Sequence, residues 1–200
     1  IDITWNRVAG GAAIAPLVQA LESSFDFKSP SKSIPQLLRI HQSILALPAS
    51  DWKRIKLADC EKLIKDCLGL FVELRTNKFK ASPGSELLVT LEVINRSNTE
   101  VRLVSMEVTS NDNVFALPST LVYNQGYTKE LTIQTPEQLS IPYWLIKHPE
   151  EGMYKVDQQK KRGTPADPPS ITAAVKIEIN GTSITLQAPV IYKTVDPAEG

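Results

Sequence analysis

The stretch ASPGSELLVTLEVINRSNTEVRL, residues 81–103, decides the fold class of this chain. After a Pro-Gly pair that favours a turn, every second residue from Leu87 to Val93 is large and apolar. Successive side chains of a β-strand point to opposite faces, so the pattern predicts a strand with one face in a hydrophobic core. The polar run NRSN, residues 95–98, then predicts a turn before the next strand.

The same period of two recurs along the C-terminal two thirds of the chain. The alternating or β-branched runs cover residues 70–77, 85–95, 99–108, 129–135, 171–179 and 183–192. Asn180 and Gly181 join the last two runs, and both residues tolerate the positive φ of a type I′ hairpin turn. Short strands separated by turn signals are typical of a sandwich, so we expect an immunoglobulin-like antiparallel β-sandwich over residues 71–200.

The N-terminal third has apolar residues at helical spacing instead. A first helix is expected over residues 17–25. A second is expected to begin with Ser33 as its N-cap and to end before Pro48, and a third to begin at Ser50 and continue to about residue 70. The predicted fold is therefore α+β.

The expected division of the chain follows from this change of period. Residues 1–70 form a helical segment and residues 71–200 form the β-sandwich domain, with the boundary near residues 69–76.

Composition and charge restrict the partners of this chain. Of its 200 residues, 42% are hydrophobic and 22% are charged, as in ordinary globular proteins. Basic and acidic residues number 22 each, so the chain lacks the positive charge that binds nucleic acid or an anionic membrane surface. No apolar run reaches the roughly 20 residues of a membrane-spanning helix. We expect neither a nucleic-acid partner nor a membrane span.

The chain begins at Ile1, without an initiator methionine or a signal sequence. We therefore expect it to be a piece of a longer protein. Its two cysteines, Cys60 and Cys67, lie on one face of the predicted third helix, about 10 Å apart along the axis, which is too far for a disulfide. We expect both to face a core as small apolar residues.

Several segments resemble a known family. The run PGSELLVTLEVINRSNTEVRL resembles the opening strands of immunoglobulin-like accessory modules in bacterial carbohydrate-active enzymes. WNRVAGGAAIAPLVQAL, IPYWL, the GMY of residues 152–154 and the ending PVIYKTVDPAEG are together similar to the region downstream of the catalytic domain in long PIG-L (LmbE-like) de-N-acetylases of Bacteroidetes. The resemblance covers nearly the whole chain.

The resemblance implies a function for the parent protein. Members of that family have an N-terminal Rossmann-like zinc domain that hydrolyses the acetamide of an N-acetylglucosamine-type sugar. Its marks are a His-Pro-Asp-Asp motif and a later His-x-x-His, and neither is intact here. The implied function is a non-catalytic accessory module of a secreted or periplasmic enzyme. Its partner would be the catalytic domain of the same chain, which would hold the zinc and which this module would brace or supply with substrate.

The sequence HPEE, residues 148–151, is similar to His-Pro-Asp-Asp with longer carboxylates. A catalytic zinc site needs ligands that converge from separated segments, and the only other histidine, His41, lies in a helical stretch. We therefore predict that HPEE is a surface loop and that this chain has no catalytic, cofactor-binding or metal-ligating residue. An autonomous hydrolase would require a metal at His41 or His148.

Tyr143, Trp144 and Tyr154 are the candidate glycan contacts, because the flat C–H faces of sugars pack on aromatic rings. The alternative is that these rings, like Tyr123 and Tyr127 before them, are buried in a core or a domain interface. Two further functions remain open. One is a carbohydrate-binding module that uses these aromatics, and the other is a protein-interaction or assembly module with an extended apolar patch.

Two features have simple structural interpretations. KVDQQKKRGTPADPP, residues 155–169, is predicted to be a solvated loop, with contact to an acidic partner surface as the alternative. Asn95 and Asn180 each begin a glycosylation acceptor sequence, but each coincides with a turn that favours Asn for backbone reasons. We expect both to be turn residues.

Overall fold

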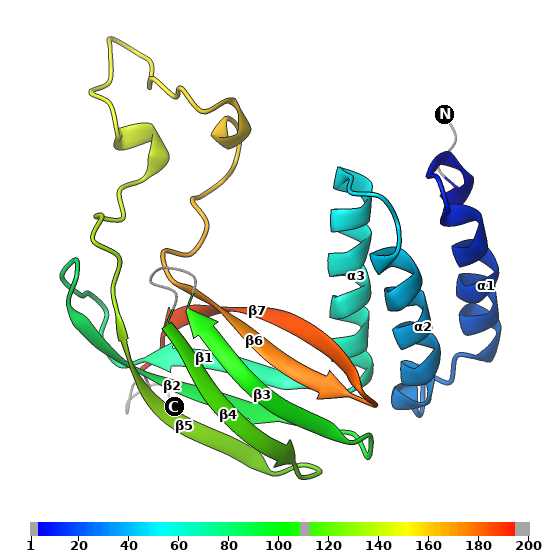
Figure 1. Ribbon diagram of the computed structural model, residues 1–200. Coiled ribbons are helices and arrows are strands. Elements are labelled where there is room, and N and C mark those ends of the chain that lie inside the picture. Colours follow the sequence, from blue (N-terminus) through cyan, green and yellow to red (C-terminus); the bar gives the residue numbers. More distant parts are fainter. Residues whose placement is uncertain (1–3, 109–112, 195–200) are drawn as a thin grey trace.

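The computed structural model describes residues 4–108 and 113–194, and within these ranges helices precede strands (Figure 1). The helices are α1 (Ile14–Ser24), α2 (Ile34–Leu45) and α3 (Asp51–Cys67). The strands are β1 (Phe71–Thr76), β2 (Glu86–Ile94), β3 (Val101–Val108), β4 (Asn113–Leu121), β5 (Gly126–Gln134), β6 (Thr172–Ile179) and β7 (Thr182–Tyr192). Short 3-10 helices are η1 (Trp5–Arg7), η2 (Gly11–Ala13), η3 (Pro30–Ser33), η4 (Tyr143–Leu145) and η5 (Gln159–Lys161). The α+β class is confirmed.

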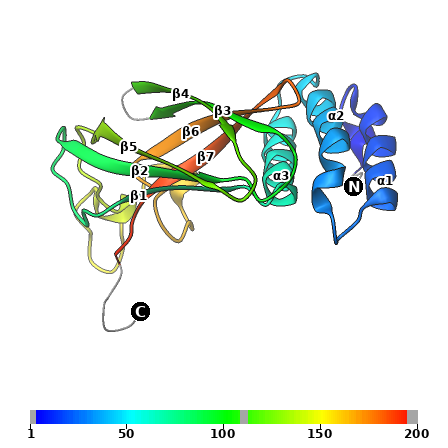
Figure 2. The same cartoon turned by 90° about the horizontal axis from the view of Figure 1, so that it is seen from below.

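The strands form one mixed sheet of seven strands, in the order β4-β3-β6-β7-β1-β2-β5 (Figure 2). Neighbours pair antiparallel except β1 and β7, which pair parallel, with Leu74 opposite Val190. The sheet curls into a nearly closed barrel. The expected immunoglobulin-like antiparallel β-sandwich is therefore wrong, because β7 pairs with β6 over residues 182–189 and then with β1 over residues 190–192. This long strand joins the two groups of strands that a sandwich would keep apart.

β4 was not predicted from the sequence, because Pro118 interrupts its apolar pattern. The structure tolerates this proline at a β-bulge. The pairing of β3 with β4 passes from Leu103 opposite Ser119 to Ser105 opposite Ala116, which leaves Pro118 at the irregularity. β4 is also an edge strand of the sheet, and edge strands and bulges are the places where a missing N–H is tolerated.

The predicted alternation of β2 is confirmed. Leu87, Val89, Leu91 and Val93 are buried, whereas Leu88 between them is exposed. The predicted hairpin is confirmed as well, since Asn180 and Gly181 both have positive φ, 49° and 77°, and Ile179 pairs with Thr182 across the turn.

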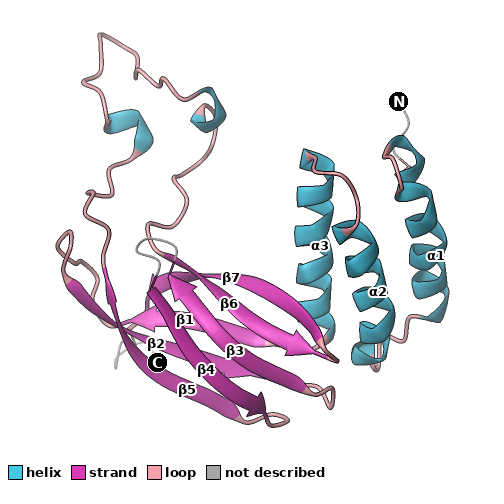
Figure 3. Ribbon diagram, viewed as in Figure 1, coloured by secondary structure: helices cyan, strands magenta, loops and turns pink. Residues whose placement is uncertain are grey.

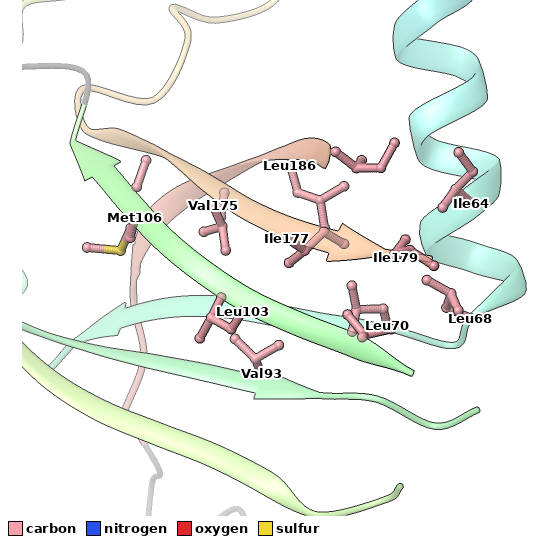
Figure 4. Close-up of a cluster of buried hydrophobic side chains, with 14 of the residues drawn as sticks. Ile64, Leu68, Leu70, Val93, Leu103, Met106, Val175, Ile177, Ile179 and Leu186 are labelled. Atoms are coloured by element: carbon pink, nitrogen blue, oxygen red, sulfur yellow. The ribbon is translucent and has the colours of Figure 1, made fainter. Parts of the chain in front are cut away.

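The barrel core continues into the helices (Figure 4). Ile64 and Leu68, at the C-terminal end of α3, are fully buried in the same hydrophobic cluster as Ile177 and Ile179 of β6. Gln42 of α2 also donates a hydrogen bond of 3.3 Å to Thr182 Oγ1 at the hairpin. The helices therefore cover one end of the barrel.

The predicted starts of the second and third helices have different outcomes. Ser50 caps α3 as expected, because its Oγ accepts a hydrogen bond of 3.1 Å from the Lys53 amide. Ser33 occupies the predicted N-cap position of α2, with Pro35 in the first turn, but its side chain does not act as a cap. Its backbone is helical and its side chain makes no capping hydrogen bond, because η3 runs directly into α2 and leaves no separate helix start at that point.

A long segment leaves the barrel between β5 and β6, and we call residues 136–171 the β5–β6 excursion. Figure 3 shows that it is mostly loop, with η4 and η5 as its regular elements, and that it extends well away from the strands. It contains Tyr143, Trp144 and Tyr154, the HPEE sequence, and the predicted solvated loop of residues 155–169, most of which is exposed.

Candidate functional site

Tyr143 ties the outgoing and returning legs of the β5–β6 excursion together. Its amide donates a hydrogen bond of 2.7 Å to Asp167 Oδ2, and its hydroxyl donates one of 2.9 Å to the carbonyl of Thr164. Lys161 Nζ lies 2.9 Å from Asp167 Oδ1. The hydrogen bond from Lys161 and that from the Tyr143 amide lower the pKa of Asp167 below its ordinary value. The carboxylate is therefore charged at neutral pH and fixes the backbone of Tyr143, whereas the bond to the Thr164 carbonyl fixes the ring.

A second set of contacts orders the tip of the excursion. Asp157 pairs with Lys147, and this hydrogen bond and charge lower the pKa of Asp157, with further contributions from Arg162 and Lys155. Arg162 Nε donates a hydrogen bond of 2.9 Å to the carbonyl of Val156. The pair of Asp157 with Lys147 joins the segment that follows Tyr154 to the residues that follow η4, so it holds Tyr154 near the η4 segment.

The three predicted glycan contacts line one open depression. Tyr143 and Trp144 are in edge contact, with ring centroids 4.9 Å apart and planes at 87°. Tyr154, 59% exposed, lines the same depression, which has a volume of about 840 Å³. We call it the aromatic depression. Its other lining residues are Met153, Lys155, Val156, Asp157, Arg162 and Gly163.

Sequence reasoning missed several residues of the aromatic depression. Arg162 and Asp157 fall within the segment predicted to be a solvated loop, and Met153 carries no local signal of a binding role. Tyr123 and Tyr127 do not line the depression. Tyr123 is exposed just after β4, and Tyr127 on β5 packs against the barrel core.

The histidines occupy different surroundings. His41 on α2 is buried, and its Nε2 lies 3.3 Å from Glu61 Oε1 on α3. His148 is exposed on the excursion, with Nδ1 3.0 Å from the carbonyl of Pro149, and the rest of HPEE is exposed with it, as predicted. Within residues 4–108 and 113–194, no group of three or more His, Cys, Asp or Glu side chains is placed to hold a metal ion.

The cysteines and the glycosylation sequences are explained by local structure. Cys60 faces the core as predicted, and burial raises the pKa of its thiol to about 12. Cys67 is half-buried, and burial raises its pKa as well. Asn95 is buried in the turn after β2, so it is a turn residue as expected. Asn180 is exposed at the β6–β7 hairpin.

In the part of the chain that the structure describes, no helix has the length and hydropathy needed to cross a membrane.

Comparison with known proteins assigns no family. The sequence matches no family model and no curated protein sequence. Among solved structures, the sporulation control protein Spo0M from Bacillus subtilis is 12% identical over 60% of this chain and 49% of that chain, with a TM-score of 0.27. The alkylpurine DNA glycosylase AlkC of Pseudomonas fluorescens, bound to DNA with an abasic site analog, is 9% identical over 84% of this chain and 49% of that chain, with a TM-score of 0.24. The matches span about half the length of both proteins, and these scores are too low to assign a shared fold.

Proposed function

We propose that this chain is a non-catalytic accessory module that binds a glycan in the aromatic depression and presents it to a catalytic domain of the same protein. The observation that carries the proposal is the convergence of Tyr143, Trp144 and Tyr154 on one concave surface, although they come from two separate segments of the excursion. The C–H groups of a sugar face carry partial positive charge and pack on the negative face of an aromatic ring.

The contacts around the aromatic depression support binding to a polar ligand. Lys155, Asp157 and Arg162 line it and supply donors and acceptors for sugar hydroxyls. The Tyr143 ring is already fixed by its hydrogen bond to the carbonyl of Thr164. A ring fixed before binding loses less conformational freedom when a ligand packs on it, and this favours affinity.

The resemblance to PIG-L de-N-acetylases supports the choice of ligand. Those enzymes act on N-acetylglucosamine-type sugars, so oligomers of N-acetylglucosamine are the first ligands to test. The parent protein on this proposal is secreted or periplasmic. The partner on this proposal is the catalytic domain, which supplies the zinc and the hydrolytic residues.

Titration with N-acetylglucosamine oligomers tests the proposal. We expect saturable binding by calorimetry and a change in tryptophan fluorescence, both lost in Trp144→Ala. Tyr154→Ala should weaken binding about tenfold, through loss of one aromatic contact. Tyr123→Ala is the matched control, because Tyr123 is 56% exposed but lies outside the depression. Equal binding by all variants, or no binding by the unchanged chain, would refute the proposal.

A protein-interaction or assembly module is the second candidate, and a separate observation favours it. The excursion exposes large apolar side chains, namely Leu139, Ile141, Leu145, Ile146 and Met153. Exposed apolar groups gathered on one segment mark interaction surfaces. Sedimentation of the isolated chain over a concentration series should then show self-association that Ile146→Lys removes. If the chain is a monomer at every concentration, self-association is refuted, and a separate partner domain is the remaining occupant of this surface.

A further inference from the structure

A second cavity lies at the end of the barrel that is opposite to α3. β1 begins beside α3 and ends at Thr76, and β7 begins at the hairpin near α2 and ends at Tyr192, so both strands lead to this end (Figure 1). The cavity has a volume of about 280 Å³. It lies between the β1–β2 connection, both legs of the β5–β6 excursion, and the end of β7. We call it the barrel mouth. None of its lining residues belongs to the aromatic depression.

The walls of the barrel mouth are held in place by hydrogen bonds. The amide of Gly84 donates to the carbonyl of Pro136 at 3.2 Å, which ties the outgoing leg of the excursion to the β1–β2 connection, and Thr135 Oγ1 just before this leg donates to the carbonyl of Ser82 at 2.7 Å. The amide of Val190 donates to the carbonyl of Ile171 at 3.0 Å, which ties the returning leg to β7. The cavity is therefore formed before any ligand binds, which lowers the entropic cost of binding.

Two aromatic side chains, Phe79 and Tyr192, are exposed to solvent at the barrel mouth. Phe79 is 73% exposed and makes an edge contact with Tyr192, with centroids 5.4 Å apart and planes at 72°. Leu139, from the outgoing leg, is exposed at the same cavity. Large apolar groups that surround a concave surface and are left in solvent indicate a ligand with an apolar body.

The described lining of the barrel mouth has one charged side chain, that of Lys78, and the carboxylate of Glu137 lies beside Gly84, outside the lining. Lys78 lines the cavity, and Lys80 Nζ lies 5.9 Å from the Phe79 ring centroid. Neither lysine makes an ion pair with another residue in the described ranges, and the described lining includes no Asp or Glu. An unpaired ammonium group beside an aromatic surface favours a ligand that carries a negative charge next to its apolar body.

We infer that the barrel mouth binds a small organic anion of the aromatic carboxylate class. The ring of the ligand packs against Phe79 and Tyr192, and its carboxylate pairs with Lys78. The volume of about 280 Å³ is at the lower end of ligand pockets, so the ligand is a single ring system with a short acidic side chain.

The test uses phenylacetate and indole-3-acetate as probes, with the neutral amide of each as its partner. Dissociation constants are measured by ligand-observed NMR. We expect each acid to bind about fivefold more tightly than its amide, and Lys78→Gln to remove this difference. Phe79→Ala should weaken acid and amide alike, by about tenfold, because both pack on the ring.

The chain offers a matched control for Phe79→Ala. Phe27 is 77% exposed, and Lys28 Nζ lies 5.9 Å from its ring centroid, so this pair reproduces Phe79 and Lys80 outside the barrel mouth. Phe27→Ala should bind the probes as the unchanged chain does. Equal affinity for acid and amide overturns the charge assignment, and absence of binding by both, or equal losses in Phe27→Ala and Phe79→Ala, overturns the site. None of these outcomes affects the glycan proposal, which depends on Trp144.

Discussion

At the scale of single residues, Asn95 shows how one polar side chain fixes a turn. It is buried, and its Oδ1 accepts hydrogen bonds from the amide of Ser97 at 3.1 Å and from Ser97 Oγ at 2.9 Å. Its Nδ2 donates to the carbonyl of Thr99 at 2.8 Å. This side chain satisfies groups that would otherwise be buried without partners between β2 and β3.

We expect Asn95→Ala to lower the free energy of unfolding by about 1–3 kcal/mol, because it leaves buried donors and an acceptor unsatisfied. Urea denaturation followed by far-ultraviolet circular dichroism measures the change. Asn98→Ala in the same turn is the control, since Asn98 is exposed, and its effect should stay within about 0.5 kcal/mol. Equal losses in the two variants would contradict this account.

The chemistry of their aromatic rings predicts Tyr143, Trp144 and Tyr154 as site residues. It does not predict that the three residues converge on one depression. This convergence depends on Asp167 and Asp157 meeting lysines several residues away, and nothing in the local pattern marks these pairs. The aromatic residues of the candidate site could therefore be predicted from the sequence, whereas its charged lining residues Lys155, Asp157 and Arg162 could not.

At the scale of elements, the β6–β7 hairpin depends on Gly181, where the backbone conformation favours glycine although there is space for a larger side chain. Gly181 has φ of +77°, and nothing lies within 4 Å of an added Cβ. We expect Gly181→Ala to cost about 1 kcal/mol through backbone strain alone. Gly126→Ala is the control, because a Cβ there makes ordinary contacts at 3.9 Å and 4.0 Å without positive φ. Thermal denaturation that shows no difference between the two variants would refute the strain argument.

The contacts of Asp167 with the Tyr143 amide and with Lys161, which we call the clamp, should respond to acid. The pKa of Asp167 is lowered from 3.8 by its hydrogen bonds, so the folded state binds this proton more weakly than the unfolded chain. The clamp is therefore fully present above the ordinary aspartate pKa and is lost as the pH falls through the lower, folded value. We expect the Tyr143 amide proton, followed by NMR, to titrate with a midpoint below 3.8. Asp167→Asn should abolish this titration, and a midpoint at or above 3.8 would show that the clamp is absent.

At the scale of the whole molecule, the local pattern and the pairing of strands differ in what the sequence reveals. The buried face of β2 and the hairpin turn at Asn180 follow from side-chain alternation and backbone preference within a few residues, and both were predicted. The parallel pairing of β1 with β7 brings together the first and the last of the described strands along the chain. Alternation specifies which face of a strand is buried but not which strand lies beside it, so the barrel could not be distinguished from a sandwich.

The joint between α3 and the barrel determines whether the molecule unfolds as one unit. Leu68 is fully buried in the cluster that includes Ile177 and Ile179, so Leu68→Ala removes contacts between the helical part and the sheet. We expect a loss of about 2–5 kcal/mol in unfolding free energy, with helix and strand signals still lost in a single transition. Leu63→Ala is the control on the same helix, because Leu63 is half-exposed, and it should cost about 1 kcal/mol or less. If circular dichroism and tryptophan fluorescence instead reported separate transitions in the unchanged chain, the shared core would not couple the helices to the barrel.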